Sequence, residues 1–367
     1  MNLIQDQIKD IEKEIRETPY HKGTEHHIGK LRAKLARLKD REIESIIIKK
    51  GKGGGGYSVK KQGEATIILI GPPSAGKSTL INKLTNAKSK IAPYAFTTVS
   101  VIPGMMKYND TNIQVLDVPG LIEGAEEGKG RGKEVLSVAR GADLVLLITD
   151  IERIYWLDRI QKILYKNGVR LNQIKPDVTI DKKLKGGLVV HTNIKQPFNK
   201  EDVKEIASEF GIKNAEITIR EPLTFERLAD AFSRNRVYVP TIKVINKVDN
   251  IVISNLHKLL IKHQVDPNGV IPISAERELN LNELKKLIWK KLNFIRIYLI
   301  RKDEEPHTNS PLIVKENTTL SQVAQNIGSE FAENKRKAII WGPSAKFPGQ
   351  EVSLQTQALH NMIIRFV

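Results

Sequence analysis

The stretch TIILIGPPSAGKSTLINKL, residues 66–84, decides the fold of this chain. It opens with a short apolar run, Thr66–Ile70, that predicts a buried strand. The pattern GxxxxGK[ST] follows at Gly71–Ser78, and the sequence Thr79–Leu84 after it favours a helix. Strand, glycine-rich loop and helix in this order are the context of a phosphate-binding loop, so a chance glycine turn is the weaker explanation.

Such a loop holds phosphate with backbone N–H groups and the positive end of the following helix. We expect the Lys77 ammonium group to reach the β- and γ-phosphates of a nucleotide, and the Ser78 hydroxyl to bind Mg²⁺. The residues of this loop that we expect to contact the nucleotide are Gly71, Pro73, Ser74, Ala75, Gly76, Lys77, Ser78 and Thr79.

A second motif, Asp117-Val-Pro-Gly120, ends the apolar run Ile113–Leu116. Asp117 could hold Mg²⁺ through a water molecule, and Gly120 could bring its N–H to a γ-phosphate. On its own such a tetrapeptide is more often an ordinary turn, but the phosphate loop favours the functional reading. Thr97 and Thr98 precede it, and a hydroxyl there could complete the Mg²⁺ shell, or the pair could simply belong to a strand.

A third motif selects the base. Asn246-Lys-Val-Asp249 ends the run Thr241–Ile245, and the Asp249 carboxylate could accept hydrogen bonds from the guanine N1 and N2 groups. Adenine lacks that donor pair, which would leave a charge unsatisfied. Asn246 and Lys247 would brace the base and the loop. The backbone of Ser274, Ala275 and Glu276, after the next run, would contact the guanine oxygen. All these motifs follow strands, and ligands gather at that edge of open α/β sheets.

Apolar runs alternate with helical stretches after residue 65, which predicts an α/β domain with a mostly parallel sheet. The runs are Thr66–Ile70, Ile113–Leu116, Leu144–Thr149, Thr241–Ile245 and Val270–Ile273. Residues 151–236 are too many for one crossover helix. Within them Leu188–Val190 and Ala215–Ile219 resemble strands and Asn199–Phe210 a helix, so we expect an inserted small α+β subdomain.

Both ends of the chain carry further patterns. Isoleucine and leucine recur at helical spacing in residues 4–43, and Thr18-Pro19 interrupts them, which predicts two helices that pad the next domain or bind a partner. Gly51–Gly56 is too glycine-rich for a regular element. A basic helix after Leu281 leads to a tail with strands at Ile297–Ile300, Leu312–Val314, Ala338–Trp341 and Met362–Val367, and a helical stripe at residues 320–331.

Composition narrows the class of protein. The 367 residues suggest two or three domains, and the absence of cysteine excludes disulfides and thiolate metal sites. No apolar run approaches the ~20 residues of a membrane helix, so we expect a cytoplasmic protein without membrane partners. The formal charge of +17 attracts polyanions such as RNA, unless the basic side chains merely solvate helix surfaces.

Taken together, these motifs resemble the Obg superfamily of GTPases, and within it the developmentally regulated GTP-binding protein (DRG) family. The most specific stretch is DVPGLIEGAEEGKGRGKEVLSVAR at Asp117–Arg140. GPPSAGKSTLINKLT at Gly71–Thr85 and YAFTTVSVIPG at Tyr94–Gly104 support it. NRVYVPTIKVINKVD at Asn235–Asp249 and AIIWGPSAK at Ala338–Lys346 extend the resemblance over essentially the whole chain.

The resemblance implies a GTP-hydrolysing switch that acts with ribosomes, binds GTP or GDP with Mg²⁺, and uses Thr98 as the Mg²⁺ ligand in preference to Thr97. It implies a DRG family regulatory protein and ribosomal RNA as partners. We expect no DNA partner and a chain that is monomeric when free. It further implies a P-loop G domain with an N-terminal helical hairpin, an inserted subdomain and a C-terminal TGS domain of β-grasp fold. The expected segments are a hairpin (1–50), a glycine-rich linker (51–65), the first part of the G domain (66–151), an inserted α+β subdomain with one G-domain helix (152–236), the second part of the G domain (237–295) and a TGS domain (296–367).

Two positions bear on hydrolysis. Leu121 stands where Ras-like GTPases place a glutamine that orients water, so we expect slow intrinsic turnover that a partner, the ribosome or a monovalent cation accelerates. Ser74 stands where potassium-activated relatives often have asparagine, which argues against potassium. The glycine-rich segment Glu123–Gly132 predicts a mobile switch that the γ-phosphate orders, or else an inert surface loop.

Two rival functions remain open at this point. An ATP-dependent P-loop enzyme, such as a small-molecule kinase, would prefer adenine and give Asp249 no role. An RNA- or ribosome-binding adaptor, in which nucleotide is mainly structural, would bind ribosomes whatever nucleotide is present.

Overall fold

The computed structural model describes residues 3–19, 24–49, 62–85, 92–93, 100–118, 132–301, 303–343 and 345–367. The chain divides into two compact units. The first unit contains Met1–Gly56 and Leu164–Tyr238, and the second contains Tyr57–Ile163 and Val239–Val367. Each unit has hydrophobic core clusters of its own. In the described part of the chain, no helix is both long and apolar enough to cross a membrane.

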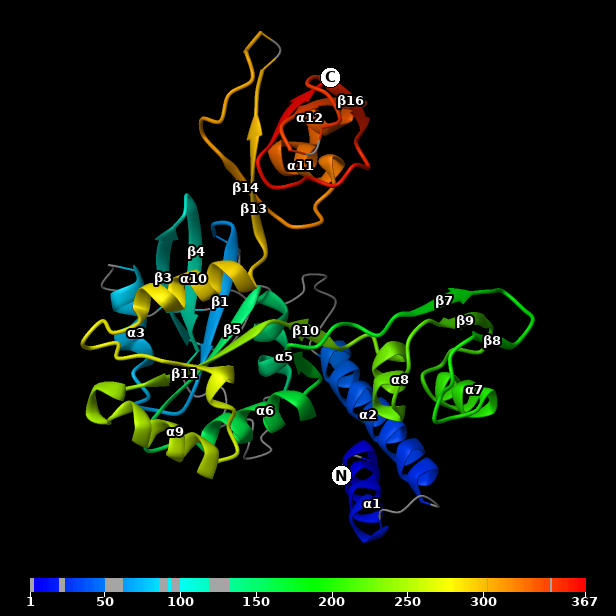
Figure 1. Cartoon of the computed structure of the whole chain (residues 1–367). Coiled ribbons are helices and arrows are strands. Elements are labelled where there is room, and N and C mark those ends of the chain that lie inside the picture. The colour runs from blue at the N-terminus through cyan, green and yellow to red at the C-terminus, as the bar shows by residue number, and fades with distance from the viewer. Residues whose placement is uncertain are drawn as a thin grey trace. The chain divides into compact units, whose positions relative to one another are not determined.

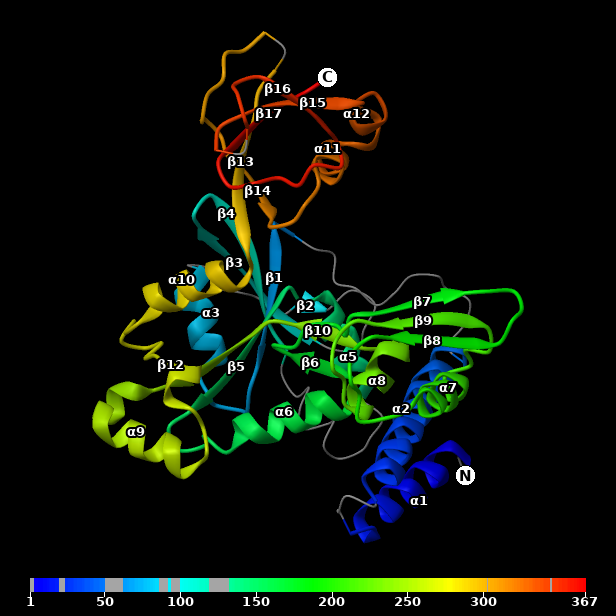
Figure 2. The ribbon, with the colours of Figure 1, turned by 45° about the vertical axis from the view of Figure 1, so that its right-hand side comes forward.

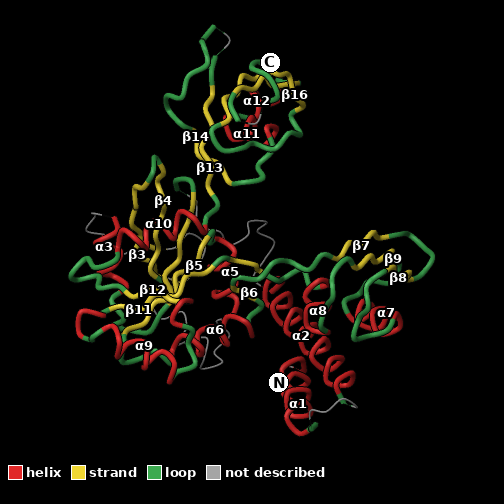
Figure 3. Tube along the Cα trace, in the orientation of Figure 1, coloured by secondary structure: helices red, strands yellow, loops and turns green. Residues whose placement is uncertain are grey.

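A seven-stranded sheet forms the centre of the second unit (Figure 1). Its strands lie in the order β12-β11-β5-β1-β4-β3-β2, shown in yellow in Figure 3. The five apolar runs of the sequence are all strands of this sheet. The bounds are β1 (Ala65–Ile70), β2 (Ala92–Pro93), β3 (Ser100–Tyr108), β4 (Thr111–Asp117), β5 (Leu144–Asp150), β11 (Thr241–Asn246) and β12 (Val270–Pro272).

The sheet is mostly parallel, as its sequence predicted, and becomes antiparallel at one edge. The strands from β12 to β4 are parallel, as expected. Strand β3 returns antiparallel to β4, and β2 is antiparallel to β3. Asn109 and Asp110 make the turn between β3 and β4 and both have positive φ, +48° and +63°. Two such residues favour a tight hairpin whose twist matches the strands, and that local geometry makes this edge antiparallel.

Helices cover the sheet because alternate strand residues need apolar partners on each face. Leu80, Ile81 and Leu84 of helix α3 (Lys77–Thr85) join the core with Ile67 and its alternate neighbours on β1. Helix α10 (Leu281–Lys291) packs into the same core. The other helices of this part of the chain are α5 (Gly132–Gly141), α6 (Trp156–Lys166) and α9 (Ile253–Lys262), with short 3₁₀ turns η1 (Val248–Asn250) and η2 (Pro267–Gly269).

A separate five-stranded sheet follows in the C-terminal part of the second unit, in the order β14-β13-β17-β15-β16. Helix α11 packs on it through buried Leu320, Val323 and Ala324. The helical stripe predicted for residues 320–331 is two helices, because the chain leaves helical geometry at Gly328. The bounds are β13 (Phe294–Leu299), β14 (Leu312–Lys315), α11 (Leu320–Ile327), α12 (Ser329–Glu333), β15 (Lys337–Trp341), β16 (Gln350–Ser353) and β17 (Met362–Phe366).

In the first unit, helices α1 (Leu3–Glu17) and α2 (Glu25–Lys49) pack through Ile8, Ile11, Leu31 and other apolar residues. A three-stranded sheet β7-β9-β8 lies beside helices α7 and α8 (Figure 2). Strands β6 and β10 form a two-stranded ribbon. The bounds are β6 (Val169–Leu171), β7 (Val178–Lys182), β8 (Leu188–Thr192), α7 (Lys200–Glu209), β9 (Ala215–Ile219), α8 (Phe225–Phe232) and β10 (Val237–Val239).

Four buried charges connect α2, α8 and the β6–β10 ribbon in the first unit. Arg170 donates from Nε and Nη2 to the two Asp230 carboxylate oxygens, at 2.6 and 2.8 Å. Arg236 donates from Nε to the same carboxylate at 2.5 Å and from Nη1 to Asp40 at 3.0 Å. We call Asp40, Arg170, Asp230 and Arg236 the buried ion network. Its two positive and two negative groups balance, as burial of charge requires.

Candidate nucleotide-binding site

The loop after β1 is shaped by two glycines that no other residue could replace. A Cβ atom on Gly71 would lie 2.1 Å from the Ile148 carbonyl oxygen. Gly76 has φ +88°, and a Cβ there would lie 2.2 Å from Nδ2 of Asn246. Ser74, between them, also has a positive φ of +59°. The loop therefore curls tightly enough for its backbone N–H groups to converge, as phosphate binding requires.

Lys77 is the first residue of helix α3 and lies over this loop. Its Nζ donates to the carbonyl oxygens of Gly71 and Pro72 at 3.0 and 2.9 Å. These contacts hold the ammonium group against the backbone of the loop. Thr79 is half-buried in the first turn of the same helix. Because Lys77 begins this helix, its charge and the positive end of the helix dipole lie at the same place.

Ser78 and Asp117 form the candidate metal centre. The Ser78 hydroxyl donates to Oδ2 of Asp117 at 3.3 Å. Asp117 ends strand β4, is 2% exposed, and its Oδ1 atom has no hydrogen-bond partner within the described ranges of the chain. Burial raises the pKa of Asp117, against the opposing effects of Lys77 and Ser78. A buried carboxylate oxygen without a partner fits a hard cation or a water bound to one, so these two residues suit Mg²⁺.

This pair differs from a metal site built by protein ligands alone. Within the residues that the structure describes, no group of three or more acidic or histidine side chains could hold an ion. Mg²⁺ is commonly bound by one or two protein groups together with water and substrate phosphates, and Ser78 with Asp117 match that pattern. The predicted ligand Thr98, its alternative Thr97, and the predicted catalytic Gly120 lie outside the described residues, as does Leu121.

Asn246 joins two loops that are far apart in the sequence. Its Nδ2 donates to the Ala75 carbonyl oxygen at 2.9 Å, and its Oδ1 accepts from the Ala275 N–H at 2.9 Å. The side chain is 2% exposed. Asn246 therefore fixes the spacing between the phosphate loop and the loop of Ser274, Ala275 and Glu276. The sequence predicted a bracing role for Asn246 but not these two partners.

Two residues that sequence reasoning missed complete this bracing. Asp150 ends strand β5, is 1% exposed, and accepts from Lys247 Nζ at 3.1 Å. Arg153 donates to both Asp150 oxygens at 3.2 and 2.5 Å and to the Pro73 carbonyl oxygen at 2.6 Å. Burial opposes ionisation of Asp150, but Arg153 and Lys247 outweigh it and hold its pKa below the ordinary value.

We call Pro73, Asp150, Arg153 and Lys247 the loop bridge. It connects the residue in the middle of the phosphate loop with the lysine that precedes the base-reading aspartate. The sequence contained one indication that Asp150 belongs to the site. Like Asp117, it ends a buried strand of the sheet.

Asp249 is exposed in the turn η1 and belongs to the same edge of the sheet. A hydrogen bond from the Ser274 side chain lowers the pKa of Asp249, so the carboxylate is ionised at neutral pH. The Ser274 hydroxyl also accepts from the Arg277 N–H at 3.1 Å, which fixes its orientation. Ser274 is fully buried and Glu276 is exposed. An ionised, oriented and accessible carboxylate can accept both guanine donors.

Comparisons with known proteins agree with this geometry. A family model described as a 50S ribosome-binding GTPase matches residues 66–182, and a model of the C-terminal region of that domain matches residues 185–294. An uncharacterized GTP-binding protein of Methanocaldococcus jannaschii is 44% identical over 96% of this chain and 89% of its own length.

Two relatives carry a more specific name. Developmentally-regulated G-protein 3 of Arabidopsis thaliana is 37% identical over 100% of this chain and 99% of its own length. The developmentally-regulated GTP-binding protein 1 homolog of Dictyostelium discoideum is 39% identical over 94% of each chain. Full-length similarity at this level, together with a phosphate loop joined to a guanine-reading loop, identifies the chain as a member of the developmentally regulated GTP-binding protein family of P-loop GTPases, which hydrolyse GTP.

Proposed function

We propose that this GTPase is a molecular switch that binds ribosomes, and that its GTP- and GDP-bound states differ in that binding. The observation that carries the switch is the pair of connections made by Asn246 and the loop bridge, since they couple the phosphate loop to the base-reading loop. The ribosome link is supported by the matching family, which is described as a 50S ribosome-binding GTPase, and by the charge of +17.

Within this proposal the nucleotide contacts are those expected from the motifs. The phosphate loop and Lys77 hold the phosphates, and Asp249 reads guanine. Mg²⁺ would be bound by Ser78 and Thr98 and, through water, by Asp117, and it would neutralise charge on the β- and γ-phosphates. Gly120 would bring its N–H to the γ-phosphate. The partner-less Oδ1 of Asp117 supports this assignment.

The proposal also assigns the remaining parts of the chain. Helices α1 and α2 would be the helical hairpin (1–50), residues 152–236 the inserted α+β subdomain with one G-domain helix, and residues 296–367 the TGS domain. The five-stranded sheet with α11 across it supports a β-grasp fold for that last segment. A DRG family regulatory protein would be its protein partner in the cytoplasm, and the free chain would be a monomer.

Leu121 leads us to propose slow intrinsic hydrolysis that ribosomes accelerate, because an apolar side chain cannot orient water by hydrogen bonds. Single-turnover hydrolysis of GTP, with and without ribosomal subunits, measures this directly. We expect a faster reaction with ribosomes. Equal rates in the two samples would contradict the proposed activation, and rates compared in potassium and sodium buffers would show whether a monovalent cation contributes.

Co-sedimentation with ribosomal subunits under a GTP analogue, GDP or no nucleotide tests the switch itself. We expect most protein in the ribosomal pellet with the GTP analogue and least with GDP. The adaptor alternative predicts the same amount in all three samples. Absence of ribosome binding in every sample would disprove the proposed function while leaving GTP hydrolysis intact.

A further inference from the structure

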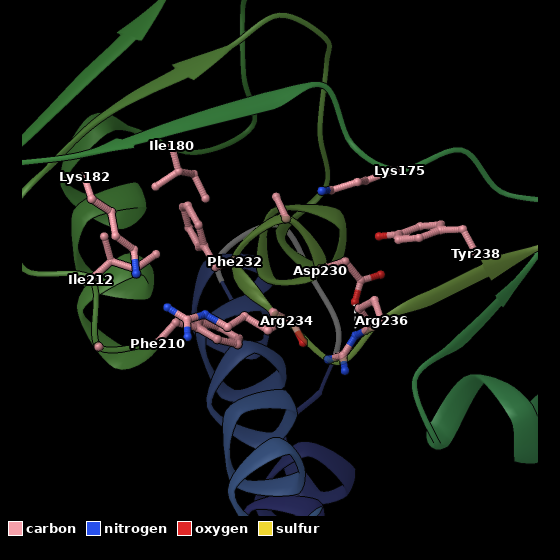
Figure 4. Close-up of a pocket in the computed structure, with 13 residues that line it drawn as sticks. Lys175, Ile180, Lys182, Phe210, Ile212, Asp230, Phe232, Arg234, Arg236 and Tyr238 are labelled. Atoms are coloured by element: carbon pink, nitrogen blue, oxygen red, sulfur yellow. Dashed lines mark hydrogen bonds and ion pairs between the residues drawn. The ribbon is translucent and has the colours of Figure 1, made fainter. Parts of the chain in front are cut away.

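A cavity of about 300 Å³ lies in the first unit, away from the nucleotide site (Figure 4). Its walls come from strand β7, the residues after helix α7, and the C-terminal end of α8 with the segment that follows. Apolar side chains form part of the lining, and three basic side chains surround them. The apolar residues are Ile180, Phe210, Ile212 and Phe232, and the basic residues at the exposed positions are Lys175, Lys182 and Arg234.

The described part of the chain does not neutralise these three basic side chains. Among the residues that the structure describes, the side chains of Lys175, Lys182 and Arg234 make no ion pair or hydrogen bond. Of the described residues that line the cavity, Asp230 alone carries a carboxylate, and its charge is already shared by Arg170 and Arg236. Because the buried ion network is balanced, three positive charges around one hollow remain, and they favour an anion there.

Tyr238 supplies an unused hydrogen-bond donor on the same wall. Its hydroxyl is buried and finds no hydrogen-bond partner among the described residues. Figure 4 shows the hydroxyl end of the ring turned toward the part of the cavity that Lys175 and Asp230 line. Burial raises the pKa of Tyr238 to about 12, so the hydroxyl keeps its proton at neutral pH. A buried hydroxyl without a partner is uncommon in folded proteins, and a small adjustment toward an anionic oxygen would satisfy it.

We propose that this cavity binds single-stranded RNA, with one phosphate at Lys182 and Arg234, the neighbouring base against Phe210, and a further part of the backbone at Lys175 and Tyr238, at the other end of the cavity (Figure 4). The volume exceeds what a lone phosphate needs, and half-buried Phe210 offers an aromatic surface on which a base can stack. The charge of +17 favours a polyanion over a singly phosphorylated peptide. This inference rests on the proposed ribosome association, for which it names a contact with RNA.

Fluorescence anisotropy with a short labelled single-stranded RNA and the full-length chain tests the cavity. The variant is Lys182→Glu with Arg234→Glu, and the matched control is Lys185→Glu with Lys195→Glu. The control makes the same change in charge on two exposed lysines of the same unit that do not line the cavity and have no ion pair among the described residues. We expect the cavity variant to bind RNA roughly tenfold more weakly than the control. The slope of the logarithm of its binding constant against the logarithm of salt concentration should become shallower by roughly 0.7 for each lost phosphate contact.

The outcomes separate specific from general attraction. Equal losses in the two variants would show that any surface charge suffices and would overturn the proposal, as would wild-type binding by the cavity variant. Thermal unfolding of both variants is measured first, and Lys182→Gln with Arg234→Gln repeats the test if charge reversal disturbs folding. Tyr238→Phe, which keeps the ring, should weaken RNA binding a few-fold, whereas a purely structural tyrosine would leave it unchanged.

Competition identifies the source of the phosphate. We expect unlabelled RNA to displace the probe far better than inorganic phosphate or a phosphoserine peptide, and displacement by the peptide at lower concentration than RNA would overturn RNA as the ligand. These results also distinguish a failure of the RNA site from a failure of the proposed ribosome association. If only the ribosome association is wrong, the wild-type protein will bind RNA oligonucleotides at the cavity but will not sediment with ribosomes.

Discussion

Two buried carboxylates, Asp230 in the first unit and Asp117 in the second, have similar burial but opposite surroundings. Asp230 is 5% exposed and accepts three hydrogen bonds from two guanidinium groups. Asp117 is 2% exposed, accepts one long hydrogen bond from Ser78, and keeps one oxygen without a partner. The carboxylate that the protein satisfies completely stabilises the fold, and the one it leaves partly unsatisfied is available to a ligand.

Asp150 stands between these cases. Its charge is satisfied by Lys247 and Arg153, as in a structural network, but both partners belong to loops of the nucleotide site. It is therefore a positioning residue, whose effect on nucleotide comes through other groups. The comparison predicts that substitutions at these carboxylates, or at their partners, will change different properties. Some will change nucleotide binding, some stability and some hydrolysis. The four carboxylates are Asp249, Asp230, Asp117 and Asp150.

The largest effect should come from Asp249→Asn. The amide loses the charge that accepts both guanine donors, so we expect the affinity for GTP to fall by at least about a thousandfold and xanthine nucleotides to bind better. Competition of GTP, ATP and XTP against labelled GDP measures the change. Retained preference for GTP would show that another group reads the base, and preference of the wild type for ATP would favour a kinase-like enzyme.

Asp230→Ala should act on stability instead. Two buried guanidinium groups would lose their shared carboxylate, and removal of one partner from a buried pair costs about 3–5 kcal/mol. Denaturant unfolding measures this, with Asp177→Ala as the control, since Asp177 pairs with Arg220 at an exposed position where about 0.2–1 kcal/mol is expected. Similar losses in the two variants would mean that the buried ion network is not a principal source of stability.

Asp117→Asn should instead slow GTP hydrolysis without lowering stability. The substitution removes a desolvated charge, so we expect the free energy of unfolding to stay the same or rise. Hydrolysis of GTP at saturating Mg²⁺ should fall by about 10–100-fold, as for other groups that act on a metal through water. Single-turnover rates over a range of Mg²⁺ concentrations provide the measurement, and an unchanged rate would remove Asp117 from the proposed metal centre.

Arg153→Ala should have the smallest effect of the four. It removes the hydrogen bond to the Pro73 carbonyl oxygen and one partner of Asp150, and we expect GDP affinity to fall about tenfold. Arg159→Ala is the matched control, because Arg159 lies on helix α6, where its guanidinium group stacks on the Trp156 ring. Equal affinities of the two variants would show that the loop bridge does not position the phosphate loop.

The sequence alone determined the parts that depend on short-range physics. Five apolar runs became the strands of the central sheet, because burial on both faces requires continuous apolar residues. The spacing of Gly71, Gly76 and Lys77 specified the phosphate loop, since only glycine tolerates the positive φ and close approach at Gly76. Asn246 and Asp249 were recognisable because their order after a strand is itself a local pattern.

Only the tertiary structure decided which distant groups meet. Arg153 reaches the Pro73 carbonyl oxygen, and Arg236 reaches Asp40 across 196 positions of the chain. No spacing rule predicts such pairs, because a guanidinium group finds its partner through the packing of whole elements. Likewise the turn at Asn109-Asp110 made one edge of the sheet antiparallel. Periodicity fixes which residues are buried, but the balance of buried charge is settled only when strands and helices bring those residues together.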